Sequence, residues 1–177
     1  MFRGPDGWID AVRLAAVPFA VLEAATEGYA EGEEPLAWLL VASLALAAVA
    51  LPLAGRSGRP AWLGTGALVF DTAFLSAWAV LYAAEPGTPA RELLVLAAVE
   101  AGLRYGPRGA VWALATLPAL VLFELRLSNA LDAPFDVGHA VFPAGLYGLV
   151  GLVVGALSEE RRRAGSRAPP AAPPPSA

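Results

Sequence analysis

The stretch PLAWLLVASLALAAVALPL, residues 35–53, contains no charged side chain and decides the fold class of this chain. A helix rises about 1.5 Å per residue, so roughly 20 apolar residues cross the hydrocarbon core of a bilayer. Comparable stretches occur at Ala61–Tyr82 and Val137–Leu157. Apolar residues make up 57% of the 177 residues, whereas soluble domains contain about 45–50%. Lipid is therefore the expected solvent.

Three weaker stretches bring the number of predicted spans to six. Gly109–Phe123 is short and contains Pro118, which membrane helices tolerate when neighbours satisfy the freed carbonyl. Pro89–Tyr105 has an apolar core interrupted by Glu100, and Trp8–Ala25 carries three charged residues around a short apolar centre. The alternative for Trp8–Ala25 is a signal peptide, which would leave five spans. The predicted fold is all-α: a polytopic membrane protein built as a bundle of six transmembrane helices.

The predicted domain organisation is one six-helix transmembrane module, residues 1–163, followed by a tail, residues 164–177. The tail is rich in Pro and Ala and lacks the apolar side chains that a packed core needs, so we expect it to be disordered and cytoplasmic. Gly165 and Ser166, with the prolines after them, are expected to stop the last helix.

Arginines alternate with acidic residues from one junction to the next. Residues 55–60 and 104–108 each contain two Arg, and residues 158–167 contain four, whereas residues 23–34 contain five Glu and no Arg. Basic loops stay in the cytoplasm, so we expect a multi-pass protein of the cell membrane with both termini cytoplasmic. The rings near span ends are expected at the membrane interface, with ordinary packing as the alternative: Trp8, Trp38, Trp62, Tyr82 and Tyr105.

Five charged residues fall inside or close to the predicted spans, where a lone charge is unfavourable. Asp71 lies near the middle of the third span. Glu100 and Arg104 are four residues apart, and Asp10 and Arg13 are three apart, so each pair shares a helix face. We expect all five to face the bundle interior as a ligand-binding or proton-sensing polar cluster. The alternative is a structural ion network that sets helix register.

The composition argues against several chemistries. With no Cys and no Lys, the chain has no thiolate ligand and no amine for a retinal or pyridoxal Schiff base. The single His139 falls at the outer end of the last span, where an interfacial polar role is expected. We therefore expect no catalytic residues, no metal, no cofactor and no nucleic-acid partner. An acid/base pair of Asp71 and Glu100 is the least favoured alternative, because no motif supports a reaction class.

Five short motifs follow one another in a recognisable order: VFDTA at 69–73, EPGTP at 85–89, VEAGLRYG at 99–106, PFD at 134–136 and GLVGLVVG at 148–155. Their order and spacing resemble the N-terminal membrane region of actinobacterial sensor proteins. The resemblance covers residues 61–163 well and residues 8–53 loosely. In that family the membrane module precedes cytoplasmic GAF, histidine kinase or GGDEF domains.

The resemblance implies a sensor-like signal-transduction module, with Asp71, Glu100 and Arg104 at matching motif positions. No phosphoacceptor or cyclase motif follows the last span here, so the implied module lacks a catalytic domain and needs a cytoplasmic signalling partner. The alternative is a small-molecule binding or transport subunit, because six spans with both ends inside resemble the substrate-binding component of vitamin energy-coupling transporters. The GxxxG at Gly151–Gly155 predicts close packing within the bundle, with a homodimer seam as the alternative.

Overall fold

The computed structural model describes residues 5–26, 32–56, 61–84 and 90–167. All regular secondary structure in these ranges is helical, which confirms the all-α prediction. The elements are α1 (Pro5–Thr26), α2 (Glu34–Arg56), α3 (Ala61–Leu81), η1 (Glu92–Leu94), α4 (Val95–Tyr105), η2 (Gly106–Thr116), α5 (Leu117–Ala130) and α6 (Val137–Arg167). The motif at residues 85–89 lies outside the described residues.

Four helical segments of the described ranges are long and apolar enough to cross a membrane: Glu34–Gly55, Trp62–Leu81, Glu92–Ala130 and Val137–Ser166. The length and composition of these four segments are compatible with a membrane protein. Helix α1 is long enough but is not among the four, because Asp6, Asp10, Arg13 and Glu23 leave no stretch of 18 residues with fewer than three charged side chains.

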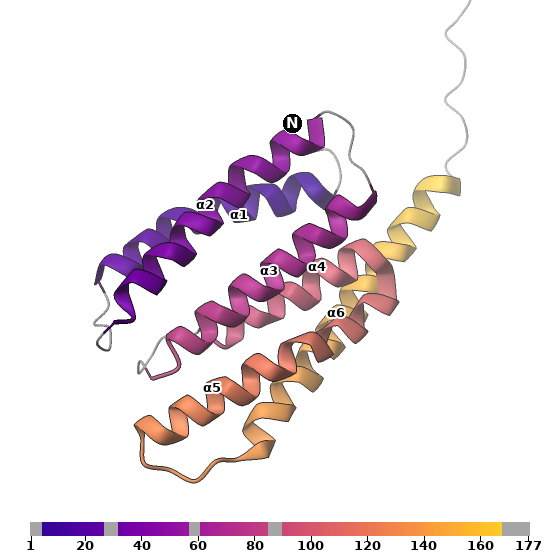
Figure 1. Cartoon of the computed structure of the whole chain (residues 1–177). Coiled ribbons are helices and arrows are strands. Elements are labelled where there is room, and N and C mark those ends of the chain that lie inside the picture. The colour runs from indigo at the N-terminus through magenta and orange to yellow at the C-terminus, as the bar shows by residue number, and fades with distance from the viewer. Residues whose placement is uncertain (1–4, 27–31, 57–60, 85–89, 168–177) are drawn as a thin grey trace, which may run out of the picture.

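The Glu92–Ala130 segment is folded back on itself at Gly106. This glycine has a φ of +66°, a backbone conformation that residues other than glycine rarely adopt, and Pro107 follows it. A Cβ added to Gly109 would collide with the backbone of Ala101, so η2 returns closely along α4. The segment is therefore two antiparallel rods, η1–α4 and η2–α5, as Figure 1 shows.

Helix α1 packs mainly on α2, and α4 packs mainly on α6 and η2, while α3 lies between these two groups and contacts α2, α4 and α5 (Figure 1). An aromatic ladder on α3 forms part of the core, with ring centroids of Phe74 and Trp78 5.6 Å apart and those of Trp78 and Tyr82 4.9 Å apart. Tyr82 is only 1% exposed. For Tyr82, whose ring packs on Trp78, the alternative of ordinary packing therefore applies, whereas Trp8 and Trp62 are largely exposed.

Glycines bring α6 into backbone contact with α4 and η2. A Cβ added to Gly102 would lie 2.5 Å from the carbonyl oxygen of Gly151, and one added to Gly155 would collide with the backbone of Gly106. Only hydrogen fits at such positions. The GxxxG at Gly151–Gly155 thus packs within one chain, as predicted, and a homodimer would need a different surface.

Helix α6 ends later than the sequence predicts. It continues through Gly165 and Ser166 to Arg167, so the expectation that these two residues stop the helix is wrong. An i,i+4 ion pair between Arg163 and Glu159 supports the last turns, and this support offsets the modest helix penalty of a single glycine. The last turns of α6 project beyond the other helices (Figure 1). The rest of the predicted tail lies outside the described residues.

Candidate functional site

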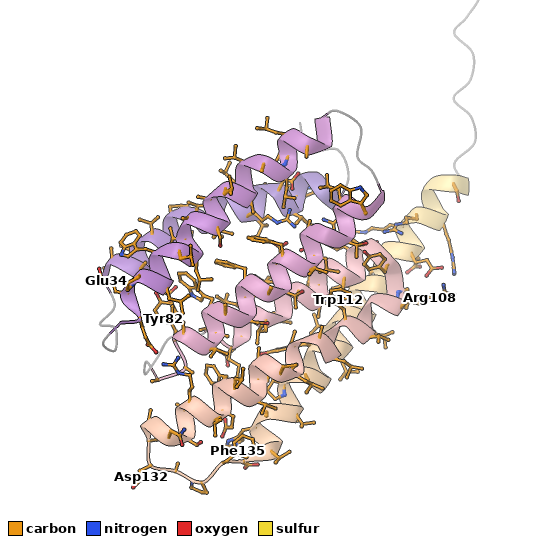
Figure 2. The ribbon with its side chains drawn as sticks, viewed as in Figure 1. Glu34, Tyr82, Arg108, Trp112, Asp132 and Phe135 are labelled. Carbon is orange, nitrogen blue, oxygen red and sulfur yellow. The ribbon has the colours of Figure 1, made fainter. Side chains whose placement is uncertain are left out.

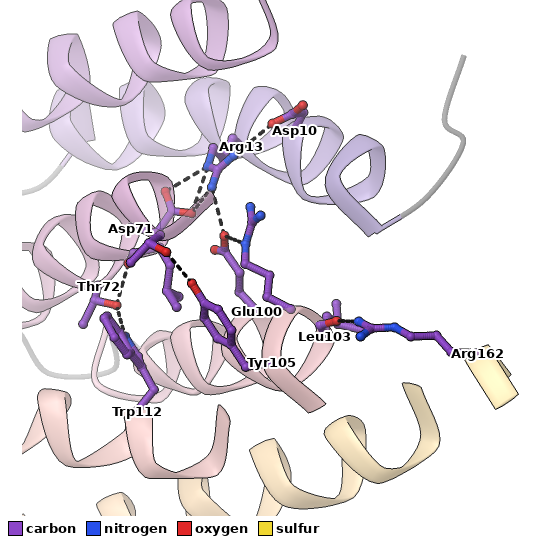
Figure 3. A network of polar contacts seen from close by, with 12 residues as sticks. Asp10, Arg13, Asp71, Thr72, Glu100, Leu103, Tyr105, Trp112 and Arg162 are labelled. Atoms are coloured by element: carbon purple, nitrogen blue, oxygen red, sulfur yellow. Dashed lines mark hydrogen bonds and ion pairs between the residues drawn. The ribbon is translucent and has the colours of Figure 1, made fainter. Parts of the chain in front are cut away.

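The five charged residues predicted to form a polar cluster meet at the seam between α1, α3 and α4 (Figure 3). Arg13 of α1 is the centre. Its Nε donates to both carboxylate oxygens of Asp71 on α3, at 2.9 Å each, and its Nη2 also pairs with Asp71. Its Nη1 donates to Asp10 Oδ1 at 2.9 Å. One guanidinium therefore binds a carboxylate of its own helix and a carboxylate 58 residues away in sequence.

Glu100 of α4 joins both arginines of the cluster. Its Oε1 accepts from Arg13 Nη2 at 3.2 Å and from Arg104 Nε at 2.8 Å. The two local pairs expected from sequence spacing, Asp10–Arg13 and Glu100–Arg104, are both present. Arg13 connects them, so the cluster is a single network rather than separate pairs.

The network is withdrawn from the surface. The side chains of Arg13 and Glu100 are 5% and 7% exposed, and those of the other three members are also mostly buried. Buried charges are stable only when they are paired and hydrogen-bonded. Within the described residues, every buried side-chain nitrogen or oxygen has a hydrogen-bond partner. Removing one member would leave a neighbour uncompensated in a low-dielectric seam.

A second polar contact secures α3 against η2 next to the cluster. Thr72 follows Asp71, and its hydroxyl donates to the carbonyl of Leu68 at 2.8 Å. The same hydroxyl oxygen accepts from Trp112 Nε1 at 2.8 Å. Sequence reasoning missed both residues. Thr72 was visible inside the VFDTA motif, but no spacing rule links it to a tryptophan 40 residues later.

Arg13, Asp71 and Glu100 of the network line part of a pocket of about 180 Å³, whose surface is almost wholly apolar. The rest of the lining is apolar and comes mainly from α1, α3 and α4, including Trp8, Val12, Phe74, Leu75, Leu96 and Leu103. A concave apolar surface with a few convergent polar groups is the usual form of a small-molecule site. The volume lies below the roughly 300–1,000 Å³ typical of drug-sized ligands, so it suits a small molecule. Sequence reasoning did not foresee this pocket.

The carboxylates of the network are directed at guanidinium groups, which occupy the positions that a cation would take. No set of three or more His, Asp or Glu residues in the described ranges is arranged to hold a metal ion. The arrangement can instead bind a polar group by hydrogen bonds, or change its own pairing when a proton or ligand arrives.

His139 lies apart from the network, at the start of α6. Its ring is 69% exposed, with Nδ1 3.4 Å from Glu124 Oε1 and Nε2 3.8 Å from Asp136 Oδ2. The neighbouring loop, marked by Asp132 and Phe135 in Figure 2, is at the opposite end of the molecule from Arg108.

Comparisons with protein-family models, with curated proteins and with solved structures find no match to this chain. The function is therefore argued from the site alone.

Proposed function

We propose that this chain is an integral membrane sensor-like module without a catalytic domain of its own. In this proposal the pocket takes up a small molecule with an apolar body and a polar group, and the ion network responds to it. The supporting observation is that Arg13 joins α1 to Asp71 on α3 and to Glu100 on α4 at the wall of the pocket. A ligand that competes for one of these hydrogen bonds changes how α1 sits on the bundle.

We propose further that six rods cross the membrane, with both termini in the cytoplasm. Helix α1 has 22 residues, enough to span at about 1.5 Å per residue. The Glu92–Tyr105 rod rises only about 21 Å, which requires Arg91 and Arg104 to reach toward the two interfaces. Arginines dominate the end where α4 turns into η2, and Asp132 lies at the other end (Figure 2), with Asp136 following it in the same loop. The positive-inside rule assigns the arginine-rich end to the cytoplasm.

The route from the site to the cytoplasm runs through α4 into α6. Gly102 lies between Glu100 and Arg104 and packs directly on Gly151 of α6. The carbonyl of Leu103 accepts from Ser158 Oγ at 3.4 Å and from Arg162 Nη2 (Figure 3). A shift of α4 therefore moves α6, whose last turns project from the bundle and would meet a cytoplasmic signalling partner.

The test exploits the absence of Cys from this chain. A cysteine placed at exposed Ala164 carries a nitroxide label, and its mobility is measured in proteoliposomes by electron paramagnetic resonance. Asp71→Asn should change the label mobility, because it weakens the link from α1 to α3. The matched control is Asp136→Asn, which makes the same chemical change in an exposed carboxylate outside the network. Equal spectra for a folded Asp71→Asn protein and the wild type would contradict the proposal.

The pocket also supports the alternative of a small-molecule binding or transport subunit. Native mass spectrometry of protein released from its membrane would detect a bound small molecule, and Ala16→Phe, which fills the lining, should remove it. A transport subunit should also co-purify with an ATPase partner, whereas a sensor should co-purify with a kinase or cyclase. This comparison separates the two functions.

A further inference from the structure

A long groove follows the seam between α3 and the η2–α5 rod, separate from the pocket of the ion network. Its first part, about 540 Å³, is lined by Thr65, Tyr105, Arg108, Gly109, Val111, Trp112 and Ala115. Its second part, about 380 Å³, lies further along the same seam, between α3 and α5, and Ala115 lines both parts. Between Thr65 and Leu81, which line opposite ends, α3 rises about 24 Å.

Arg108 stands at one end of this groove, and among the residues that the structure describes none compensates its charge. It is exposed, and it has no ion pair or hydrogen bond to any other residue that the structure describes. Nearby arginines are engaged: Arg104 binds Glu100, Arg162 binds the carbonyl of Leu103, and Arg163 binds Glu159. The groove therefore offers at its mouth a cation that no residue of the described ranges pairs with.

Both parts of the groove are lined mainly by apolar atoms, with Arg108 at one end and Arg126, which is paired with Glu33, at the other. Near Arg108, the hydroxyl groups of Tyr105 and Thr65 lie 2.7 Å apart. Trp112 donates its ring N–H to Thr72, so the ring presents an apolar surface to the groove. Farther along, the lining is Val111, Ala115, Pro118 and Leu122, among others. Tyr and Trp rings beside an Arg mark the headgroup level of a bilayer.

We propose that this groove binds one anionic phospholipid, with its phosphate on Arg108 and an acyl chain along the seam between α3 and η2–α5. Charge complementarity selects an anionic headgroup, because a basic pocket between membrane helices attracts acidic lipids. The apolar continuation favours a lipid over a free phosphate ion, because only a lipid has an acyl chain that can pack in the second part of the groove. The inference requires only that the bundle is embedded in a membrane, and it is independent of the ligand of the ion-network pocket.

The experiment measures lipid binding to the full chain in detergent by native mass spectrometry. The probes are phosphatidylglycerol and phosphatidylcholine with identical acyl chains, and inorganic phosphate alone. Phosphatidylglycerol should bind more tightly than phosphatidylcholine. Arg108→Gln should weaken phosphatidylglycerol binding about fivefold, the effect expected of one basic side chain near a headgroup. Arg108→Lys, which keeps the charge, should retain binding within about twofold.

Two matched controls test whether binding depends on a charge and a free volume inside the groove, or on any surface charge and any added bulk. Arg161→Gln removes an exposed arginine of α6 outside the groove and should leave binding unchanged. Ala115→Phe, where the two parts meet, should weaken binding, whereas Leu114→Phe on the neighbouring exposed position should not.

The proposal is overturned by any of four results. These are equal affinity for the two lipids, equal losses in Arg108→Gln and Arg161→Gln, unchanged binding in Ala115→Phe, or displacement of the lipid by millimolar inorganic phosphate. The last result would indicate a site for the free anion.

Discussion

The α1–α3–α4 seam is closed by charged side chains, whereas the α4–α6–η2 seam is closed by glycines. In the first, long side chains bridge the helices and leave a pocket beside them. In the second, backbone meets backbone without room for a Cβ. The charged seam has alternative pairings within reach, while the glycine seam has a single close arrangement. Helix α4 belongs to both seams, so in the proposed sensor function it would carry a change at the charged seam to α6 through the glycine seam.

The largest expected effect comes from adding a side chain to the glycine seam. Gly155→Leu should prevent a stable fold, because even its Cβ would collide with the backbone of Gly106. The expected loss exceeds about 4 kcal/mol, the range of severe overpacking. Gly145→Leu is the control, since a Cβ there meets nothing within 4 Å. Size-exclusion profiles and thermal melting in detergent measure both, and similar melting of the two variants would show that the seam is looser than described.

The next effect breaks the charged seam at its centre. Arg13→Gln leaves Asp71 and Glu100 with a buried charge that Arg13 no longer compensates, and it should lower the free energy of unfolding by about 3–5 kcal/mol. Adding Asp71→Asn should recover part of that loss, because one uncompensated carboxylate is removed. Denaturation in sodium dodecyl sulfate mixtures gives the values. A double variant no more stable than Arg13→Gln would argue against direct coupling of the two groups.

A smaller effect concerns the contact that holds η2 beside the cluster. Thr72→Val keeps the side-chain shape but leaves the Trp112 N–H without its acceptor. We expect a loss of about 1–3 kcal/mol, the range for an unsatisfied buried donor. Thr65→Val, which removes an exposed hydroxyl contact, should change stability by no more than about 1 kcal/mol. Tryptophan fluorescence during unfolding reports both, and equal losses would be inconsistent with a buried Thr72–Trp112 bond.

The smallest effect tests the edge of the network. Asp10 binds Arg13 through Nη1, while Asp71 and Glu100 still compensate the guanidinium without it. Asp10→Asn should therefore reduce stability by only about 0.5–1.5 kcal/mol, the net value of one hydrogen bond. The same denaturation series measures this loss. A loss as large as that of Arg13→Gln would indicate that the network depends on Asp10 as much as on Arg13.

The local parts of the site followed from spacing, but their connection did not. Residues three or four apart share a helix face whatever the tertiary fold, so Asp10–Arg13 and Glu100–Arg104 were predictable. The bond from Arg13 to Asp71 spans 58 residues, and no periodicity in the sequence indicates which helices are neighbours. The pocket was equally hidden, because its apolar lining is indistinguishable from the lipid-facing residues of the same helices.

Two places show what local signals leave out. Tyr82 ends an apolar stretch, and neighbouring elements bury it against Trp78, which is the ordinary packing that the sequence left open. The end of α6 was placed at Gly165, but the Arg163–Glu159 pair supports the helix to Arg167. At both places tertiary or side-chain contacts add to what a local signal shows.

By itself the sequence determined that the described chain is helical and apolar enough for a membrane, because helix length and hydropathy are properties of each segment alone. It also determined which charges pair within a helix. Only the tertiary structure decided that α4 turns back at Gly106, that one arginine joins three helices, and that a pocket and a groove open between them. These features depend on which faces meet, and a face-to-face arrangement is set by close packing across the whole bundle.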